Sequence, residues 1–391
     1  MGIDLDRVRR ETPGCTQVLH FNNAGASLMP QPVVDALIGH LQLEARIGGY
    51  EAEDRAAPAI DHVYDALARL LSCRRDEIAF VENATRAWDM AFYSMRFTPG
   101  DRILTGMAEY ASNYIAYLHV ASRTGASVEA IPNDEHGQIS IDALRRAIDG
   151  RVKLISLTHV PTNGGLVNPA AAVGRVAREA GIPFLLDACQ SVGQMPVDVE
   201  TIGCDMLSGT GRKYLRGPRA TGFLYVRGAV LDRLEPPFLD LHAATWVAPD
   251  RYVVRPDARR FENWETNYAG KIALGVAVDY ALALGLEPIR DRVYALGGLL
   301  RERLRATPRV HVHDQGAERC GIVTFTVDGI DAAAVREQLA SRRINVHTSS
   351  QSSTLLDMQR RGLTRLVRAS VHYYNTEGEI DRLVAAVASL R

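Results

Sequence analysis

Short apolar runs alternate with helical patterns from residue 78 to about residue 226, and this alternation limits the fold most strongly. The apolar runs include Ile78–Val81, Arg102–Thr105, Val128–Ile131 and Val152–Thr158, and most are followed by a turn and a capped or amphipathic segment. Such alternation predicts βαβ units and a mainly parallel sheet flanked by helices. With 391 residues the chain is long enough for two unequal domains.

The C-terminal part has a different pattern. It predicts strands at Val310–His313, Gly321–Val327, Ile344–Thr348 and Arg365–Val371, with helices at Ala332–Ala340 and Thr376–Leu390. We therefore predict an α/β protein with a large domain over residues 15–285 and a small α+β domain over residues 286–391. Residues 1–30 are expected near the active site and the small domain. Residues 236–260 are expected to be irregular, and the serine-rich segment 349–353 to be a mobile loop.

The stretch from Phe184 to Arg216 places polar groups just beyond two apolar runs. These groups are an acid, an amide, a hydroxyl, a cation and an amine, namely Asp187, Gln190, Thr210, Arg212 and Lys213. In an open α/β sheet the ligand crevice lies at the carboxyl ends of the strands, so we expect these side chains to meet there. A lysine Schiff base with an aspartate facing the pyridinium nitrogen is what a protein contributes to pyridoxal-phosphate chemistry. Pyridoxal 5′-phosphate is therefore the predicted cofactor.

Two further positions fit this hypothesis, although each also has a simpler explanation. Asn83 is placed to cap a helix whose first amides, near Ala84 and Thr85, would be free to bind an anion. A plain capped helix with no ligand explains the same residues. Tyr110 lies at a strand-to-helix junction, where an aromatic residue more often packs in the core.

Composition excludes several classes of function. The formal net charge is -1, which does not suggest nucleic acid or a membrane surface as a partner. The charged N-terminus has no apolar core typical of a secretory signal, and no apolar run approaches a membrane span. Five scattered cysteines without a CxxC pair indicate reduced thiols and no metal site. These features predict a cytoplasmic protein.

The ordered motifs LHFNNAGAS, ENATR, EY, DACQS, SGTGRKYLRGP, FENWETN and RASVHYYNTEGEIDRL span nearly the whole chain. Together they resemble the class V aminotransferase group of pyridoxal-phosphate enzymes, which includes cysteine desulfurases, epimerases and C–S lyases. The resemblance implies the fold type I of pyridoxal-phosphate-dependent transferases. It also implies a homodimer, because FENWETN resembles a segment that reaches the neighbouring subunit's site.

The resemblance also implies roles for individual residues. Lys213 would form the Schiff base, Asp187 would hold the pyridinium nitrogen, and Gln190 would bond the phenolic oxygen. The phosphate would be held by Ala84, Thr85, Thr210 and Arg212, although relatives usually carry a histidine where Arg212 stands. Tyr110 would stack on the ring and Thr162 would lie near the cofactor. Arg368 would grip the α-carboxylate of an amino-acid substrate, with Ala26 and Asn113 as further substrate contacts.

One departure from the family pattern guides the prediction of the reaction. Cysteine desulfurases carry a thiolate on the loop before the carboxylate-binding arginine, and the segment 345–357 contains no cysteine. Desulfuration through a persulfide is therefore judged unlikely. The segment GGYEAEDRAA and the EY pair resemble hercynylcysteine sulfoxide lyases. We accordingly predict a C–S β-lyase that converts an S-substituted L-cysteine, or its sulfoxide, to a thiol or sulfenate, pyruvate and ammonia.

Other outcomes on the same cofactor stay open at this stage. An aminotransferase, an epimerase or a decarboxylating enzyme would need the same lysine, aspartate and arginine. A binding protein that has lost catalysis is a third possibility, and the presence of both Lys213 and Asp187 argues against it.

Overall fold

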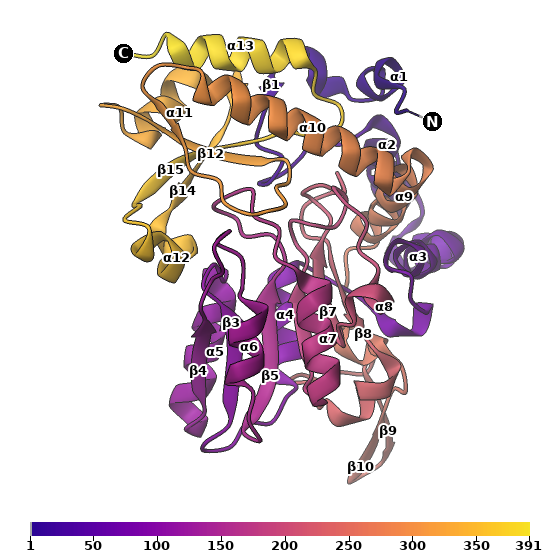
Figure 1. The fold of residues 1–391 in the computed structure, drawn as a ribbon. Helices are drawn as coiled ribbons and strands as arrows, with labels where there is room; N and C mark the ends of the chain where they lie inside the picture. Colours follow the sequence, from indigo (N-terminus) through magenta and orange to yellow (C-terminus); the bar gives the residue numbers. More distant parts are fainter. Residues whose placement is uncertain (1) are drawn as a thin grey trace.

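A seven-stranded sheet forms the centre of the large domain (Figure 1). The computed structural model describes residues 2–391. The sheet has the order β2-β8-β7-β6-β5-β3-β4, and every neighbouring pair is parallel except the two that include β8. The strands are β2 (Ile78–Val81), β3 (Arg102–Gly106), β4 (Ser127–Ile131), β5 (Val152–Thr158), β6 (Phe184–Asp187), β7 (Met206–Thr210) and β8 (Gly222–Val226). The predicted mainly parallel α/β architecture is confirmed.

Helices cover both faces of this sheet, which explains why its strands read as unbroken apolar runs. Leu185 of β6 packs in one cluster with residues of α4 (Ala84–Tyr93) and α5 (Ala111–Thr124). Phe184 and Leu186 face the opposite way, toward a cluster that includes residues of α6 (Ile141–Ala147) and α7 (Ala170–Ala180). The short helix α8 (Val199–Ile202) precedes β7. Successive side chains of a strand point to opposite faces, so both layers are held by the same strands.

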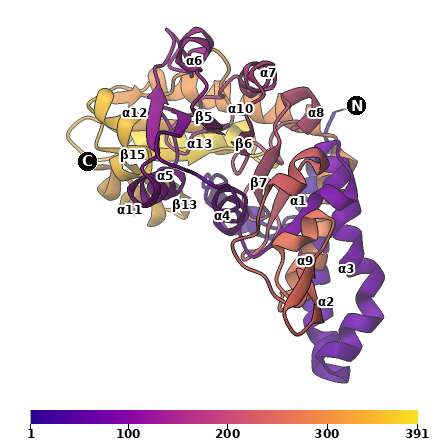
Figure 2. The same cartoon turned by 90° about the horizontal axis from the view of Figure 1, so that it is seen from below.

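Three long helices extend from the body of the large domain (Figure 2). They are α2 (Gln31–Ile47), α3 (Gly49–Leu71) and α9 (Tyr268–Leu284), and α9 packs against the other two. These contacts bury much of the apolar surface of α9 within the chain. Within residues 2–391 no single helix is long and apolar enough to cross a membrane. Helices α9 and α10 (Leu286–Arg305) together meet the length and composition criteria, but they are bent by 81°.

The small domain is built on a four-stranded antiparallel sheet of order β11-β12-β15-β14. Its strands are β11 (Val310–Val312), β12 (Ile322–Val327), β14 (His347–Ser350) and β15 (Arg365–Ser370), with helices α10, α11 (Ala332–Ala340), α12 (Leu355–Arg360) and α13 (Glu377–Ala388). The N-terminal segment joins this domain, because β1 (Leu19–His20) pairs in parallel with β13 (Ile344–Asn345). Helix α1 (Leu5–Arg10) precedes β1. Ala24 and Gly25, shortly after β1, line a cavity together with Asp187 and Lys213 of the large domain.

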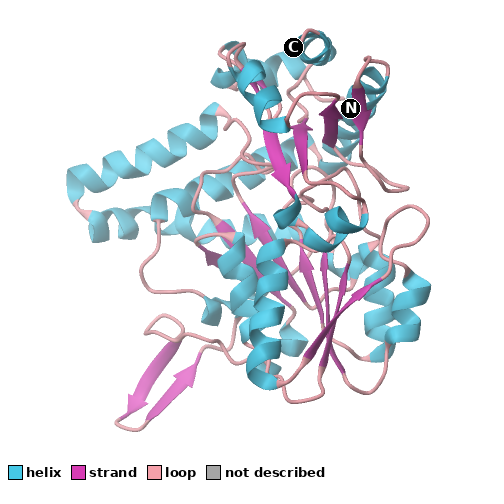
Figure 3. Cartoon of the chain, turned by 90° about the vertical axis from the view of Figure 1, so that its left-hand side faces the viewer, coloured by secondary structure: helices cyan, strands magenta, loops and turns pink. Residues whose placement is uncertain are grey.

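Two segments differ from the prediction. Residues expected to be irregular form a hairpin of β9 (Ala244–Ala248) and β10 (Arg251–Val254), which projects from the large domain (Figure 3). Most of its side chains are exposed, so the buried-and-exposed alternation of an ordinary strand is absent. The serine-rich segment is not a free loop. Ser349 and Ser350 end β14, and Gln351–Ser353 form a 3-10 turn.

A buried ion pair fixes the small domain's sheet to helix α10. Arg301 Nε donates to Asp314 Oδ2 at 2.7 Å, and the two side chains are 4% and 0% exposed. The second carboxylate oxygen accepts from the amide and hydroxyl of Thr324 on β12, and Arg301 also bonds the carbonyls of Cys320 and Ile322. The charges of this cluster are therefore compensated, as a buried pair requires.

Asp314→Ala should destabilise the protein strongly, because it leaves a buried guanidinium without its counter-charge. We expect a loss of about 3–5 kcal/mol in the free energy of unfolding. Glu235→Ala is the matched control, since the Arg96–Glu235 pair is 85% and 62% exposed and should contribute less than about 1 kcal/mol. Urea unfolding of both variants measures the difference, and equal effects would contradict this account.

Candidate active site

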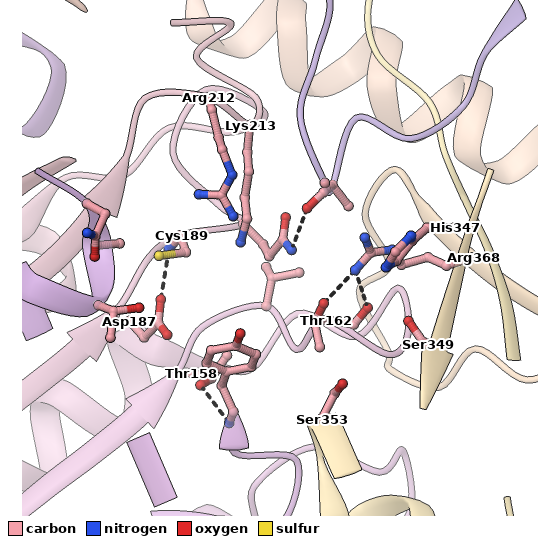
Figure 4. Close-up of a pocket in the computed structure, with 18 of the residues that line it drawn as sticks. Thr158, Thr162, Asp187, Cys189, Arg212, Lys213, His347, Ser349, Ser353 and Arg368 are labelled. Atoms are coloured by element: carbon pink, nitrogen blue, oxygen red, sulfur yellow. Dashed lines mark hydrogen bonds between the residues drawn. The ribbon is translucent and has the colours of Figure 1, made fainter. Parts of the chain in front are cut away.

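A cavity of about 560 Å³ lies at the carboxyl ends of the central strands, between the two domains (Figure 4). Thr158, Asp187 and Thr210 are the last residues of β5, β6 and β7. This is the sheet edge at which open α/β folds bind ligands. The cavity is lined by residues of both domains, namely Ala24, Gly25, Asn83, Ala84, Thr85, Tyr110, Thr158, Val160, Thr162, Asp187, Cys189, Gln190, Arg212, Lys213, His347, Thr348, Ser349, Ser353 and Arg368.

Asp187 is a buried carboxylate that is hydrogen-bonded through both oxygens. Its Oδ1 accepts from the Cys189 amide at 2.9 Å, and its Oδ2 accepts from Asn113 Nδ2 at 3.0 Å. The side chain is nevertheless open to the cavity, since Asp187 is one of its lining residues. The arrangement can hold a protonated ring nitrogen against a fixed negative charge.

Lys213 follows β7 on a loop and points into the same cavity (Figure 4). Burial lowers the pKa of its amine below the ordinary 10.5, and the positive charges of Arg212 and Arg368 lower it further, although Cys189 and Asp187 oppose this. A lowered pKa increases the neutral fraction of the amine, which is the form that acts as a nucleophile or base.

The start of helix α4 forms the end of the cavity that suits an anion. Asn83 caps the helix by accepting from the Arg86 amide at 2.9 Å, and Ala84 and Thr85 line the cavity. Helix α4 can begin here because β8 carries Gly222, where an added Cβ would lie 2.5 Å from the carbonyl carbon of Asn83. Arg212 adds a positive charge and bonds Thr210 Oγ1 at 3.1 Å. A helix N-terminus with a nearby guanidinium fits a phosphate group.

Arg368 reaches the opposite side of the cavity from β15 of the small domain. It is 5% exposed, and its guanidinium donates to the carbonyl oxygen and hydroxyl of Thr162 at 3.2 and 2.5 Å. Within residues 2–391 it forms no ion pair, and its Nε has no partner. Burial lowers its pKa to about 10, which still leaves it charged at neutral pH. A buried, unpaired guanidinium facing a cavity is suited to a carboxylate ligand.

The structure brings most of the predicted residues to one cavity. Those that line it are Ala84, Thr85, Tyr110, Thr162, Asp187, Gln190, Arg212, Lys213 and Arg368. Gln190 donates to the Ala24 carbonyl at 3.1 Å, and its buried Oε1 has no hydrogen-bond partner in the described part of the chain. The unpaired acceptor of Gln190 and the unpaired donor of Arg368 lie where a polar ligand would complete them. These groups, with the anion-binding end and the amine, fit pyridoxal phosphate.

Three predicted residues do not line the cavity. Thr210 is buried beside Arg212, where its hydroxyl accepts a hydrogen bond. Ala26 lies just beyond Gly25, and its carbonyl oxygen is 2.8 Å from His20 Nε2. Asn113 is buried, and its Nδ2 donates to Asp187 Oδ2 at 3.0 Å. The predicted substrate contacts of Ala26 and Asn113 stay predictions, and neither residue lines this cavity.

The sequence interpretation missed Glu109. This residue is buried behind the cavity wall, where its carboxylate accepts hydrogen bonds from Thr105, Thr158 and Asn113. The EY pair in the sequence could have pointed to this residue. A glutamate just before a helix needs hydrogen-bond donors for its carboxylate if the residue is buried. Within residues 2–391 no group of three or more His, Cys, Asp or Glu residues could hold a metal ion.

Comparison with known proteins identifies the family. The model of the aminotransferase class-V family matches residues 19–383. The chain belongs to this family. The predicted pyridoxal-phosphate dependence is confirmed by this membership, as is the predicted fold.

Two similar proteins and one similar solved structure are named as cysteine desulfurases. A probable cysteine desulfurase of Xylella fastidiosa (strain 9a5c) is 30% identical over 401 residues, covering 99% of this chain and 96% of that protein. A probable cysteine desulfurase of Methanothermobacter thermautotrophicus is 29% identical, covering 96% and 95%. The apo structure of a cysteine desulfurase from Thermococcus onnurineus NA1 has a TM-score of 0.91 at 27% identity, covering 99% of this chain and 98% of that chain.

These findings overturn the predicted reaction. The sequence interpretation favoured a C–S β-lyase and judged desulfuration unlikely, whereas the similar proteins are named as cysteine desulfurases. The prediction was wrong because it relied on the missing cysteine in the segment 345–357 and on two short resemblances, the segment GGYEAEDRAA and the EY pair. The similarity of this chain to cysteine desulfurases over nearly its full length is stronger evidence about the reaction than the absence of one cysteine.

Proposed function

We propose that this protein removes the sulfur atom from L-cysteine, leaving L-alanine, with pyridoxal phosphate as cofactor. The observation that carries the proposal is Arg368, a buried guanidinium that has no acidic partner among residues 2–391 and shares one cavity with Lys213 and Asp187. That combination suits an α-amino acid, since the carboxylate and the reacting carbon need separate anchors. The names of the relatives support cysteine as the amino acid.

The cofactor would be held along the floor of the cavity. We assign the phosphate to the start of α4, where Ala84, Thr85 and Arg212 would bind it. Thr210 would position Arg212, from which it accepts a hydrogen bond. Asp187 would face the ring nitrogen, Gln190 the phenolic oxygen, and Tyr110 the ring itself. Thr162 would position Arg368, to which it is hydrogen-bonded. Pyridoxal phosphate supplies an electron sink for negative charge at the substrate's Cα.

Lys213 would both anchor the cofactor and move protons. Its lowered pKa increases the neutral fraction of the amine, the form in which Nζ can take the proton from Cα. Arg368 would hold the carboxylate in a bidentate fork, which fixes the orientation of Cα relative to Nζ. The amine and the guanidinium would therefore have separate tasks, the amine at the reacting carbon and the guanidinium at the substrate carboxylate.

The sulfur must pass to a second thiol. Cys189 is the one cysteine that lines the cavity among residues 2–391, and burial raises the pKa of its thiol well above the ordinary value, with Asp187 adding to the effect. A thiol held in its protonated form is a poor nucleophile. We therefore assign the acceptor to a thiol from solution. Cysteine and RSH then give alanine and RSSH, with no oxidant or reductant needed.

We also propose a homodimer. Large apolar side chains are exposed between residues 238 and 264, on the β9–β10 hairpin and beside it. They are Phe238, Leu241, Trp246, Tyr252, Val253 and Trp264, each at least 48% exposed. Exposed apolar groups gathered in one segment mark an interaction surface. Sedimentation equilibrium at micromolar concentration should give twice the chain mass of 42.9 kDa, and a single-chain mass would contradict this.

The reaction is tested by its products. Protein loaded with pyridoxal phosphate, L-cysteine and dithiothreitol should release alanine and sulfide in equal amounts, because the persulfide first formed is reduced by dithiothreitol. Lys213→Ala should abolish turnover, while Lys153→Ala, which changes an exposed lysine at the opposite end of β5 from the cavity, should not. Formation of pyruvate and ammonia instead of alanine would contradict the proposal.

Arg368→Lys should raise KM for cysteine by roughly 10- to 100-fold, because an ammonium cannot form the two parallel hydrogen bonds of a guanidinium. Binding of the cofactor should change little. Arg365→Lys is the matched control, since Arg365 lies on the same strand but is exposed and pairs with Asp331. Steady-state kinetics separate the two variants, and an unchanged KM in Arg368→Lys would remove this arginine from the carboxylate site.

A further inference from the structure

Glu109 is a buried carboxylate that the proposed reaction does not use, and it is bonded to several parts of the cavity wall at once. Its Oε2 accepts from Thr105 Oγ1 at 2.7 Å and from the Thr158 amide at 3.1 Å. Its Oε1 accepts from Asn113 Nδ2 at 2.8 Å, from the Tyr110 amide at 3.0 Å and from the Thr158 hydroxyl. The residue is 4% exposed. Burial raises its pKa, and the hydrogen bonds from Thr158, Thr105 and Asn113 oppose that rise.

Asn113 connects this carboxylate to the one in the cavity. Its Nδ2 donates both to Glu109 at 2.8 Å and to Asp187 Oδ2 at 3.0 Å. An amide nitrogen has two protons, so one side chain can satisfy both acceptors. The orientation of the amide is fixed by chemistry, because the reverse orientation would place its oxygen between two carboxylates. Asn113 therefore holds Asp187 from behind, and Glu109 holds Asn113.

Three groups that face the cavity thus depend on Glu109. Tyr110 is held through its backbone amide, Thr158 through its amide and hydroxyl, and Asp187 through Asn113. They lie at the start of α5, the end of β5 and the end of β6, which are separate elements of the large domain. In Figure 4 Thr158 and Asp187 lie along one side of the cavity. A single buried charge therefore sets the relative position of an aromatic ring, a hydroxyl and a carboxylate.

We propose that Glu109 and Asn113 form a positioning pair that fixes Asp187 and Tyr110 against the ring of the cofactor. The inference rests on the proposed pyridoxal-phosphate site and adds residues that support it without touching the ligand. Burying a carboxylate is costly unless its acceptors are satisfied, and here five hydrogen bonds compensate it. Outer residues of this kind orient the groups that contact a bound cofactor, as they do around metal ligands.

Glu109→Gln tests the pair with almost no change in shape. An amide group cannot accept at both ends, so the fixed amides of Tyr110 and Thr158 cannot both keep their partners. Glu77→Gln is the matched control. Glu77 is also buried, at 5% exposure, and accepts from the Arg74 and Gly228 amides, but it lies at the far end of β2 from the cavity. Both variants are expected to lose some stability, measured as the melting temperature of the cofactor-free protein.

The readouts are the Kd for pyridoxal phosphate and the visible circular dichroism of the bound cofactor, which reports the orientation of the ring. Glu109→Gln should weaken binding by about tenfold or more and change the dichroism, as the loss of hydrogen bonds to charged groups implies. Glu77→Gln should leave both at wild-type values. Asn113→Ala should also weaken binding and change the dichroism, because it releases Asp187. The double variant should bind no more tightly than either single variant, because Glu109 also holds the Tyr110 and Thr158 amides directly.

The outcomes are distinct. If the wild-type protein binds pyridoxal phosphate and Glu109→Gln has the same Kd and dichroism, the positioning pair is overturned and the proposed function stands. A wild-type protein that binds no pyridoxal phosphate overturns the proposed function and the pair together. If Glu109→Gln does not fold, Asn113→Ala carries the test with the same two readouts, and wild-type values in that variant overturn the inference.

Discussion

Charges buried at the carboxyl edge of the sheet are the constraint around which the site is arranged. Asp187 is stabilised from within the protein, by the Cys189 amide and by Asn113. Arg368 has no acidic partner among residues 2–391, and its bonds go to Thr162. A buried charge is tolerated when it is paired, so the uncompensated cation indicates a site completed by an anionic ligand. The small domain matters because it supplies this cation, on a strand whose sheet is fixed by the Arg301–Asp314 pair.

The parts that sequence reasoning predicted well are those in which local pattern and position agree. The strands of the large domain are buried on both faces, so they read as apolar runs, and the residues at their ends were expected at one crevice. Asp187 and Lys213 meet there, and the cap at Asn83 starts α4 as predicted. Arg368 was found through its resemblance to a family motif. The spacing of the residues could not have shown that a strand of the second domain reaches the same cavity.

The remaining features depend on tertiary contacts that no local pattern records. The β9–β10 hairpin exposes most of its side chains, so it lacks the alternation that identifies a strand. The serine-rich segment is ordered because Asn163 donates to the Ser350 carbonyl and to Thr354 Oγ1. Glu109 resembles an ordinary charged residue at a helix start until its donors are seen. The reaction was predicted wrongly because a missing cysteine was given more weight than similarity along the whole chain.

The most direct test of this account is the position at which pyridoxal phosphate attaches. The chain has three lysines, Lys153, Lys213 and Lys271, and Lys213 is the one that lines the cavity. Borohydride reduction of the loaded protein, followed by peptide mass spectrometry, fixes the cofactor to the lysine that holds it. We predict a single modified peptide that contains Lys213. Modification at Lys153 or Lys271, or no stoichiometric modification at all, would contradict the assignment of this cavity as the active site.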